Sequence, residues 1–197
     1  VEAMGMLKVD FLGLRTLTHM RKACEWIERE HGDKLDLMTI PYERVPDDPE
    51  TDAKVLKLYD LLATGETTGV FQVEGAGMRR TLRELRPRQF QHIIAVLALY
   101  RPGPLENIPT YIRRMHGEEE VAYHHPILAD ILDDTYGIIV YQEQIMQIAV
   151  AMAGYKPGEA DMIRKAVAKK KKDLMEKHRK MFRKGAANKG ISQEVAD

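Results

Sequence analysis

The chain has 197 residues, of which 44% are hydrophobic and 30% are charged, and its 30 basic side chains balance its 30 acidic ones. This composition is typical of a globular protein with a sizeable core and argues against a disordered chain. A formal net charge of zero argues against a uniformly basic nucleic-acid-binding domain. No stretch approaches the roughly 20 apolar residues that a transmembrane helix needs. We therefore expect a cytoplasmic protein without a membrane partner.

Residues 6–14, with the sequence MLKVDFLGL, are predicted to form a short strand. Side chains alternate between the two faces of a strand, so Lys8 and Asp10 share one face and apolar residues occupy the other. A cation beside a carboxylate could hold a triphosphate and a divalent metal ion. It could also form a plain ion pair, or Asp10 could cap the next helix, and these are the commoner roles of an aspartate near a strand end.

Apolar residues at three- and four-residue intervals predict an amphipathic helix over residues 14–31. The helix should end at Gly32, because glycine readily adopts the left-handed conformation of a helix C-terminus. Its apolar stripe includes Cys24, which we expect to be a buried structural thiol.

The next stretch, residues 33–51, holds three prolines and is typical of a linker. A second helix should start at a cap formed by Thr51 or Asp52 and end at Gly65. The β-branched and aromatic residues of 67–72 then predict a short extended segment.

Most of the remaining chain has helical periodicity. Pro102 and Pro104 forbid one continuous helix through their position. A helix or a strand–helix unit is expected over 137–153. The other expected helices cover residues 74–86, 89–100, 105–116 and the basic stretch from 157 onward. The predicted fold class is therefore mainly α with a few short strands (α+β).

Charge is concentrated near the end of the chain. Residues 156–189 hold 13 Lys and Arg side chains against four Asp and Glu, a net charge of +9. On a helix, Arg164, Lys165, Lys169 and Lys172 place much of this charge along one flank. Such a flank can bind a triphosphate or a nucleic-acid backbone. A solvated lysine-rich face is the alternative, and we favour phosphate binding.

Two further segments hold candidate binding residues. Arg101 stands in a rigid Arg-Pro-Gly-Pro turn, where its guanidinium could bind phosphate oxygens or pair with a nearby acid. Residues 141–144, Tyr-Gln-Glu-Gln, could contact a base or sugar, or could cap the helix that begins there.

Five segments in this order resemble the bacterial DNA polymerase III alpha subunits, the C-family replicative polymerases. They are LKVDFLGLRTLT from residue 7, TTGVFQVEGAGM from residue 67, RPGPL from residue 101, YGIIVYQEQIMQIA from residue 136 and ADMIRKAVAKKK from residue 160. The resemblance covers nearly the whole chain. It implies that residues 1–15 are the terminal strand of a palm domain and that residues 16–197 are an incomplete helical fingers domain.

The resemblance also implies roles for individual residues. Asp10 would be the last of three palm carboxylates that bind two Mg²⁺ ions, and Lys8 would contact the phosphates of the incoming nucleotide. Arg164 and Lys165 match positions that face the triphosphate, and the run Lys169, Lys170, Lys171 and Lys172 lies near the nucleotide and DNA path. The family often has Arg where Lys165 stands, and a lysine keeps the charge but loses bidentate geometry.

The activity implied is template-directed transfer of a nucleotide from a dNTP to a primer 3′-hydroxyl by a two-metal mechanism, with primer–template DNA as partner. The family's other two catalytic aspartates lie in a Pro-Asp-x-Asp motif that this sequence lacks. Contacts with the sliding clamp, the clamp loader and the proofreading subunit also belong to regions absent here. We therefore expect a fragment that is inactive alone. The alternative is a non-catalytic helical module that binds nucleic acid through residues 156–189, with Asp10 purely structural.

Overall fold

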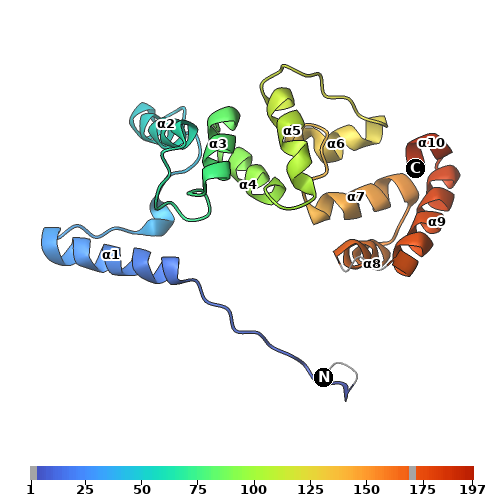
Figure 1. Cartoon of the computed structure of the whole chain (residues 1–197), viewed down its shortest axis with the longest axis horizontal. Coiled ribbons are helices and arrows are strands. Elements are labelled where there is room, and N and C mark those ends of the chain that lie inside the picture. Colours follow the sequence, from blue (N-terminus) through green and yellow to red (C-terminus); the bar gives the residue numbers. More distant parts are fainter. Residues whose placement is uncertain (1–3, 169–171) are drawn as a thin grey trace.

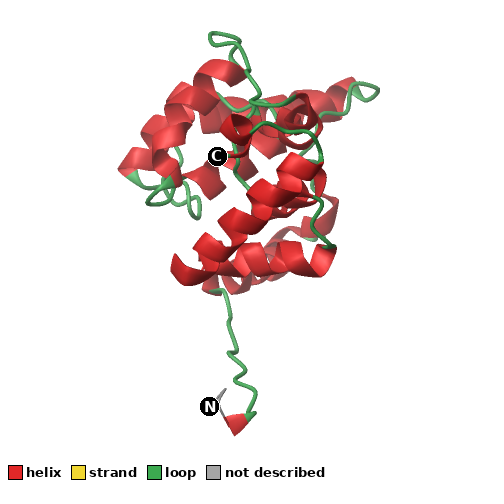
Figure 2. Ribbon diagram, turned by 90° about the vertical axis from the view of Figure 1, so that its right-hand side faces the viewer, coloured by secondary structure: helices red, strands yellow, loops and turns green. Residues whose placement is uncertain are grey.

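The computed structural model describes residues 4–168 and 172–197, and the regular structure in these ranges is helical (Figures 1 and 2). The prediction of a mainly α-helical chain is confirmed. Within the described ranges, no helix combines the length and apolar character needed to cross a bilayer. The α-helices are α1 (Arg15–His31), α2 (Pro49–Thr64), α3 (Ala76–Leu85), α4 (Phe90–Leu99), α5 (Ile108–Met115), α6 (Ala129–Leu132), α7 (Gln142–Ala153), α8 (Pro157–Ala168), α9 (Lys172–Asn188) and α10 (Gln193–Ala196). The short 3₁₀ helices are η2 (Leu37–Thr39), η3 (Pro104–Asn107), η4 (Pro126–Leu128) and η5 (Asp133–Thr135).

The predicted strand of residues 6–14 is not formed in this structure. The segment has no regular secondary structure and projects away from the helices (Figures 1 and 2). A strand needs a neighbour to bind its backbone N–H and C=O groups, and the described part of the chain provides none. Both faces of the segment are exposed, including Phe11 at 95%.

The predicted short strand at 67–72 is replaced by consecutive turns. The N–H of Val70 donates to the carbonyl of Thr67, and the N–H of Val73 donates to that of Val70. The buried hydroxyl of Thr67 donates to the Val73 carbonyl at 2.6 Å, which ties the two ends together. These local hydrogen bonds take the backbone groups that a strand would offer to a partner, so the β-type composition does not decide the conformation.

Helix α1 ends as predicted, but its apolar stripe is not buried. Gly32 has a φ of 78° and donates its N–H to the Glu28 carbonyl. No residue of α1 is buried, Trp26 is exposed, and Cys24 is only half-buried, contrary to the expectation of a buried thiol. Figure 1 shows why: α1 stands apart from the helices that form the core.

Helix α2 starts slightly earlier than expected. Asp48 is the cap, and its carboxylate accepts the N–H of Thr51 at 3.2 Å. The other predicted cap residue, Asp52, lies inside the helix, where it accepts two hydrogen bonds from the Arg44 guanidinium at 2.6 and 2.7 Å. The helix ends at Gly65, which has a φ of 68°, as predicted.

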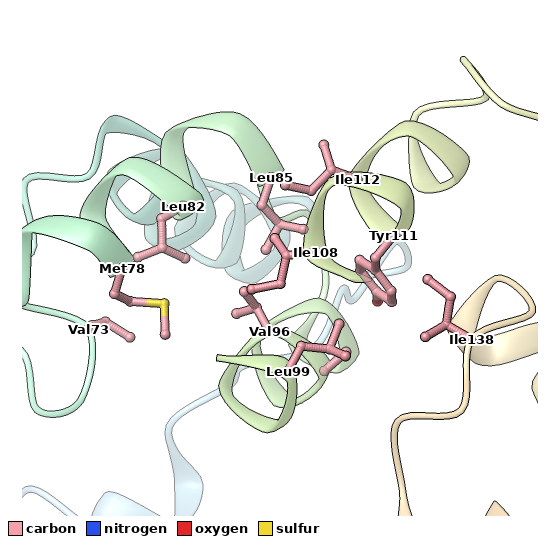
Figure 3. Packing of buried hydrophobic residues seen from close by; sticks show 11 residues of the cluster. Val73, Met78, Leu82, Leu85, Val96, Leu99, Ile108, Tyr111, Ile112 and Ile138 are labelled. Atoms are coloured by element: carbon pink, nitrogen blue, oxygen red, sulfur yellow. The ribbon is translucent and has the colours of Figure 1, made fainter. Parts of the chain in front are cut away.

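One hydrophobic core joins α3, α4 and α5. Figure 3 shows the apolar side chains of the three helices directed toward one another. Leu82, Leu85 and Leu99 are fully buried, and burying one leucine completely contributes roughly 1.5–3 kcal/mol. The cluster consists of Val73, Met78, Leu82, Leu85, Ala95, Val96, Leu99, Ile108, Tyr111, Ile112 and Ile138.

Helix α7 is the centre of the second half of the chain, because α6, α8 and α9 all pack against it (Figure 1). Small residues allow this approach, and both Ala149 and Ala153 are buried. At the end of α7, the ammonium of Lys189 donates to the carbonyls of Val150 and Ala151 at 3.2 and 2.7 Å. The carbonyl of Ala151 is one that a helix C-terminus leaves without an intrahelical partner, whereas that of Val150 also accepts the N–H of Gly154 at 3.1 Å.

His178 of α9 is buried next to Tyr155, whose hydroxyl donates to the His178 backbone carbonyl at 3.0 Å. Neither of its ring nitrogens has a hydrogen-bond partner among the described residues. Burial lowers the pKa of His178, and the charge of Lys177 lowers it further, whereas Glu159 acts in the opposite direction. The imidazole is therefore held in its neutral form.

The approach of α9 to α7 can be tested at Gly185. A Cβ atom at this position would overlap the backbone carbonyl of Ala153. Gly185→Ala should therefore lower the free energy of unfolding by about 2 kcal/mol, as overpacked cores do. Gly158→Ala is the matched control, because nothing lies within 4 Å of a Cβ there, and it should be neutral or stabilising by up to about 1 kcal/mol. Urea unfolding measures both, and equal effects would contradict the close contact.

The buried His178 should make stability depend on pH. In the unfolded chain its pKa is about 6.5, and in the folded chain it is lower, so the unfolded state binds more protons between the two values. The free energy of unfolding should therefore fall as the pH is lowered from neutral through the unfolded-state value of about 6.5 toward the lower folded-state pKa. The pKa of His92, also lowered by burial, adds to the slope in the same direction.

Thermal unfolding at several pH values measures this dependence. His178→Phe should remove part of the slope and leave the part due to His92. His19→Gln, which removes an exposed histidine of α1, is the control for loss of a histidine as such. An unchanged slope in His178→Phe would show that its protonation is not linked to folding.

Candidate functional site

The candidate site is built around Asp161 of α8. The Nε atom of Arg164 donates to one of its carboxylate oxygens at 2.9 Å, and the Nη2 atom of the same guanidinium lies 2.7 Å from that oxygen. The ammonium of Lys165 lies 2.7 Å from the other oxygen. The spacing of three and four residues places both cations on the same side of the helix as the acid. One carboxylate thus holds two cations together, and a net charge of +1 remains.

The packing of α8 fixes the direction of this group. Ala160, Ile163 and Ala166 are buried, and α8 packs against α7 and α9. The side chains of Arg164 and Asp161 are each 33% exposed, and that of Lys165 is 58% exposed. The two cations therefore lie on the accessible face of a helix that is held in place by its packing, where a ligand from solvent can reach them.

Helix α7 contributes a further contact to the site. The Nη1 atom of Arg164 donates to the side-chain oxygen of Gln142, the first residue of α7, at 3.4 Å. Two residues on, Gln144 is buried, and its side-chain oxygen accepts the backbone N–H groups of Val140 and Tyr141 at 2.8 and 2.9 Å. Of the two interpretations of residues 141–144, helix capping is thus correct for Gln144, whereas Gln142 lies beside the candidate site.

The predicted flank of four cations is described only in part. Lys169, Lys170 and Lys171 lie outside the described residues, and Lys172 is described as the first residue of α9. The predicted positions that the structure does place on this flank are Arg164 and Lys165.

Helix α9 carries a second group of cations. Lys177, Lys180 and Lys184 are exposed and recur at intervals of three and four residues, so they lie on one face of the helix. Lys180 lies 3.9 Å from Glu176. Lys177 and Lys184 form no ion pair with any described residue.

The candidates near the start of the chain lie apart from α8. The ammonium of Lys8 is 3.3 Å from the Asp10 carboxylate, and both side chains are largely exposed. Their shared side of the segment agrees with the alternation expected of an extended chain. No hydrogen bond or ion pair links them to α8 in the described ranges, and Figure 1 shows the segment running separately from the helices.

Arg101 lies at the bend between α4 and η3. Its backbone is held by the turn, because its carbonyl accepts the N–H of Leu105 at 3.1 Å. Gly103 has a φ of 103°, a conformation that favours glycine. Arg101 is exposed, and none of the described acids pairs with its side chain. Its alternative role as the partner of a nearby acid is not seen here.

A metal centre is not assembled from the described residues alone. Within them, no group of three or more His, Cys, Asp or Glu side chains is arranged to hold an ion. Asp10 has Lys8 as its neighbour rather than a second acid. The part of the chain that the structure describes therefore holds no complete ligand set for a metal ion.

Asp161 was not among the residues predicted for the site, and Gln142 was a candidate only as part of residues 141–144, not as a neighbour of Arg164. The sequence did contain a signal for Asp161, because an acid followed three and four residues later by Arg and Lys on one helix predicts ion pairs. Gln142 carried no such signal toward Arg164, since the two residues are 22 positions apart and meet only through the packing of α7 on α8.

Comparison with known proteins shows what this chain is similar to. A sequence model described as the bacterial DNA polymerase III alpha subunit finger domain matches residues 16–190. The chain is 51% identical to the DNA polymerase III subunit alpha of Thermus aquaticus, 49% to that of Bacillus subtilis and 47% to that of Aquifex aeolicus.

These alignments cover 98–100% of the chain but only 16–17% of each relative. The chain thus spans about a sixth of the length of the curated relatives it matches. The match of residues 16–190 takes in all the helices from α2 to α9 and nearly all of α1. The chain therefore belongs to the bacterial DNA polymerase III alpha subunit family, and the matched part is a finger domain.

Proposed function

We propose that this chain serves template-directed DNA synthesis as part of a replicative polymerase, and that Arg164 and Lys165 bind the triphosphate of the incoming dNTP. The observation that carries this proposal is their convergence on α8, within 2.7–2.9 Å of the same carboxylate. Two cations on one rigid and accessible helix edge suit a ligand with several adjacent negative charges.

The two cations have complementary chemistry. The guanidinium of Arg164 is planar and can donate two parallel hydrogen bonds to a phosphate group, whereas Lys165 supplies a mobile point charge. Together they would neutralise the β- and γ-phosphates and align the α-phosphate for in-line attack by the primer 3′-hydroxyl. Lys8 and Arg101 are further candidates for phosphate contacts in the same reaction.

Primer–template DNA is the second ligand in this proposal. The run Lys169–Lys172 and the α9 face formed by Lys177, Lys180 and Lys184 would contact backbone phosphates. Such contacts depend strongly on salt and carry no base specificity. The choice of base would come from pairing with the template. The alternative of a non-catalytic helical module relies on the same basic segment, and we favour the polymerase role because of the family to which the chain belongs.

Asp10 is proposed as one ligand of two Mg²⁺ ions in the whole polymerase. Such ions lower the pKa of an attacking hydroxyl and stabilise charge on a leaving group. A metal pair needs several carboxylates, and the described residues do not fit such a pair by themselves, since Asp10 faces only Lys8. The other ligands would come from beyond this chain, so we expect the chain alone to be inactive in synthesis.

The division into a palm piece, residues 1–15, and an incomplete fingers domain, residues 16–197, is part of the proposal. The exposed and unpartnered state of residues 6–14 supports it, because an apolar extended segment needs a sheet elsewhere to cover it. The sliding clamp, the clamp loader and the proofreading subunit would bind outside this chain. Chromosome copying in bacteria occurs in the cytoplasm, where we propose that the protein works.

Replacing both cations by glutamine tests the triphosphate assignment. In the full-length polymerase, Arg164→Gln with Lys165→Gln should raise the KM for dNTP by about tenfold or more, since hydrogen bonds to charged groups contribute about 1.5–3 kcal/mol each. Steady-state primer extension at varied dNTP concentration gives the KM. The matched control is Lys177→Gln with Lys184→Gln, which removes the same charge from α9. It should weaken DNA binding and leave the KM for dNTP unchanged, and an equal rise in both pairs would refute the assignment.

Replacing Asp10 tests its role as a metal ligand. Asp10→Ala in the full-length polymerase should reduce primer extension by several orders of magnitude, because one anchor of the metal pair is lost. Binding of primer–template DNA, measured by fluorescence anisotropy, should stay close to that of the wild type. Near-normal extension by this variant would reduce Asp10 to the partner of Lys8.

A further inference from the structure

Asp161 is the residue through which the two phosphate-binding candidates are held together. Its two carboxylate oxygens have different partners. One accepts from Nε of Arg164 and lies 2.7 Å from Nη2, and the other lies 2.7 Å from the ammonium of Lys165. The group is neither deeply buried nor freely exposed, with one third of the Asp161 side chain accessible. A bound anion could therefore reach the same donors.

Asp161 occupies the side of the Arg164 guanidinium that carries Nε and Nη2, and this side is well suited to binding a phosphate group. A guanidinium binds a phosphate group most strongly through two parallel N–H groups. Of the pair formed by Nε and Nη2, Nε donates to Asp161 and Nη2 lies 2.7 Å from the same carboxylate oxygen, while Nη1 donates to the neutral side chain of Gln142. Asp161 is thus the one anionic group among the described residues that competes with a phosphate for Arg164, and it competes for Lys165 as well.

We propose that Asp161 is a positioning residue that acts as the resting counter-ion of Arg164 and Lys165, and that a nucleotide triphosphate binds by taking over its hydrogen bonds. This inference rests on the proposed function of the two cations. Without a ligand, Asp161 keeps both side chains extended toward one point and limits their mutual repulsion. With a ligand, the phosphate oxygens replace the carboxylate, and Asp161 lowers the affinity for the ligand because both are anions. The hydrogen bonds from Lys165 and Arg164 hold the pKa of Asp161 below its usual range, so it is ionised under the conditions of binding.

The proposal predicts a gain of affinity, which a purely structural role would not produce. Asp161→Asn should bind inorganic tripolyphosphate about threefold to tenfold more tightly than the wild type, the range expected when one or two partly exposed ion pairs no longer compete. Isothermal titration calorimetry on the 197-residue chain at low salt measures the affinity. The difference should shrink at high salt, because exposed charges are then screened.

Glu176→Gln is the matched control. Glu176 also pairs with a lysine four residues later, in the same basic segment, but at 3.9 Å and away from Arg164. The Glu176→Gln substitution removes the same negative charge as Asp161→Asn. An equal gain of affinity in both variants would show that the gain comes from the overall charge of the segment, and it would overturn the proposal. A loss of affinity in Asp161→Asn would overturn it too. Asp161→Ala, which removes the hydrogen-bond acceptor entirely, should show the same gain of affinity. Circular dichroism and thermal unfolding establish that each variant is folded.

A double variant separates this inference from the proposed function. Arg164→Gln with Lys165→Gln should abolish most tripolyphosphate binding, and adding Asp161→Asn to it should then have no effect. Wild-type affinity in the double variant would refute the triphosphate assignment itself. Loss of binding in the double variant, together with no gain in Asp161→Asn, would leave that assignment intact and refute the role of Asp161 alone.

Discussion

The close packing of α7 against α8 and α9 is the constraint on which the candidate site depends. Gly185 leaves no space for a side chain at the α7–α9 contact, and the small side chains of Ala160 and Ala166 on α8 are fully buried. Because one face of α8 is committed to this packing, the opposite flank must present Asp161, Arg164 and Lys165 together. Gln144 fixes the other end of α7 by binding two N–H groups at its start, and this places Gln142 next to Arg164. The site is thus positioned by small residues and a helix cap rather than by its own charges.

The sequence predicted the helices well because their signals are local. Gly32 and Gly65 end α1 and α2 in the left-handed conformation, as helix C-termini favour. The strands at 6–14 and 67–72 were predicted from composition and alternation, and neither forms in the described structure. A strand is a property of two segments, so its local pattern is necessary but not sufficient. Residues 67–72 satisfy their backbone through turns, whereas residues 6–14 find no described neighbour.

The candidate site shows the same division between local and non-local information. The pairing of Arg164 and Lys165 with Asp161 can be predicted from the sequence, because residues three and four positions apart lie on the same side of a helix. The contact of Arg164 with Gln142 depends on how α7 crosses α8, which no local pattern encodes. The same holds for Lys8 and Asp10: their alternation puts them on one side of the chain, but only residues outside the described structure could turn that side into a metal site.

The lysine at position 165 is consistent with the geometry around Asp161. A second arginine would be expected if both cations had to bind a phosphate group in a bidentate manner. Here the Nε and Nη2 atoms of Arg164 both lie near one carboxylate oxygen, and the Lys165 ammonium lies 2.7 Å from the other. An ammonium can also move from one oxygen to another by rotating about its long side chain, so it can follow the exchange between carboxylate and phosphate. If the two cations bind a triphosphate as proposed, position 165 needs a positive charge on a long, mobile side chain, and the planar fork of an arginine is needed only at position 164.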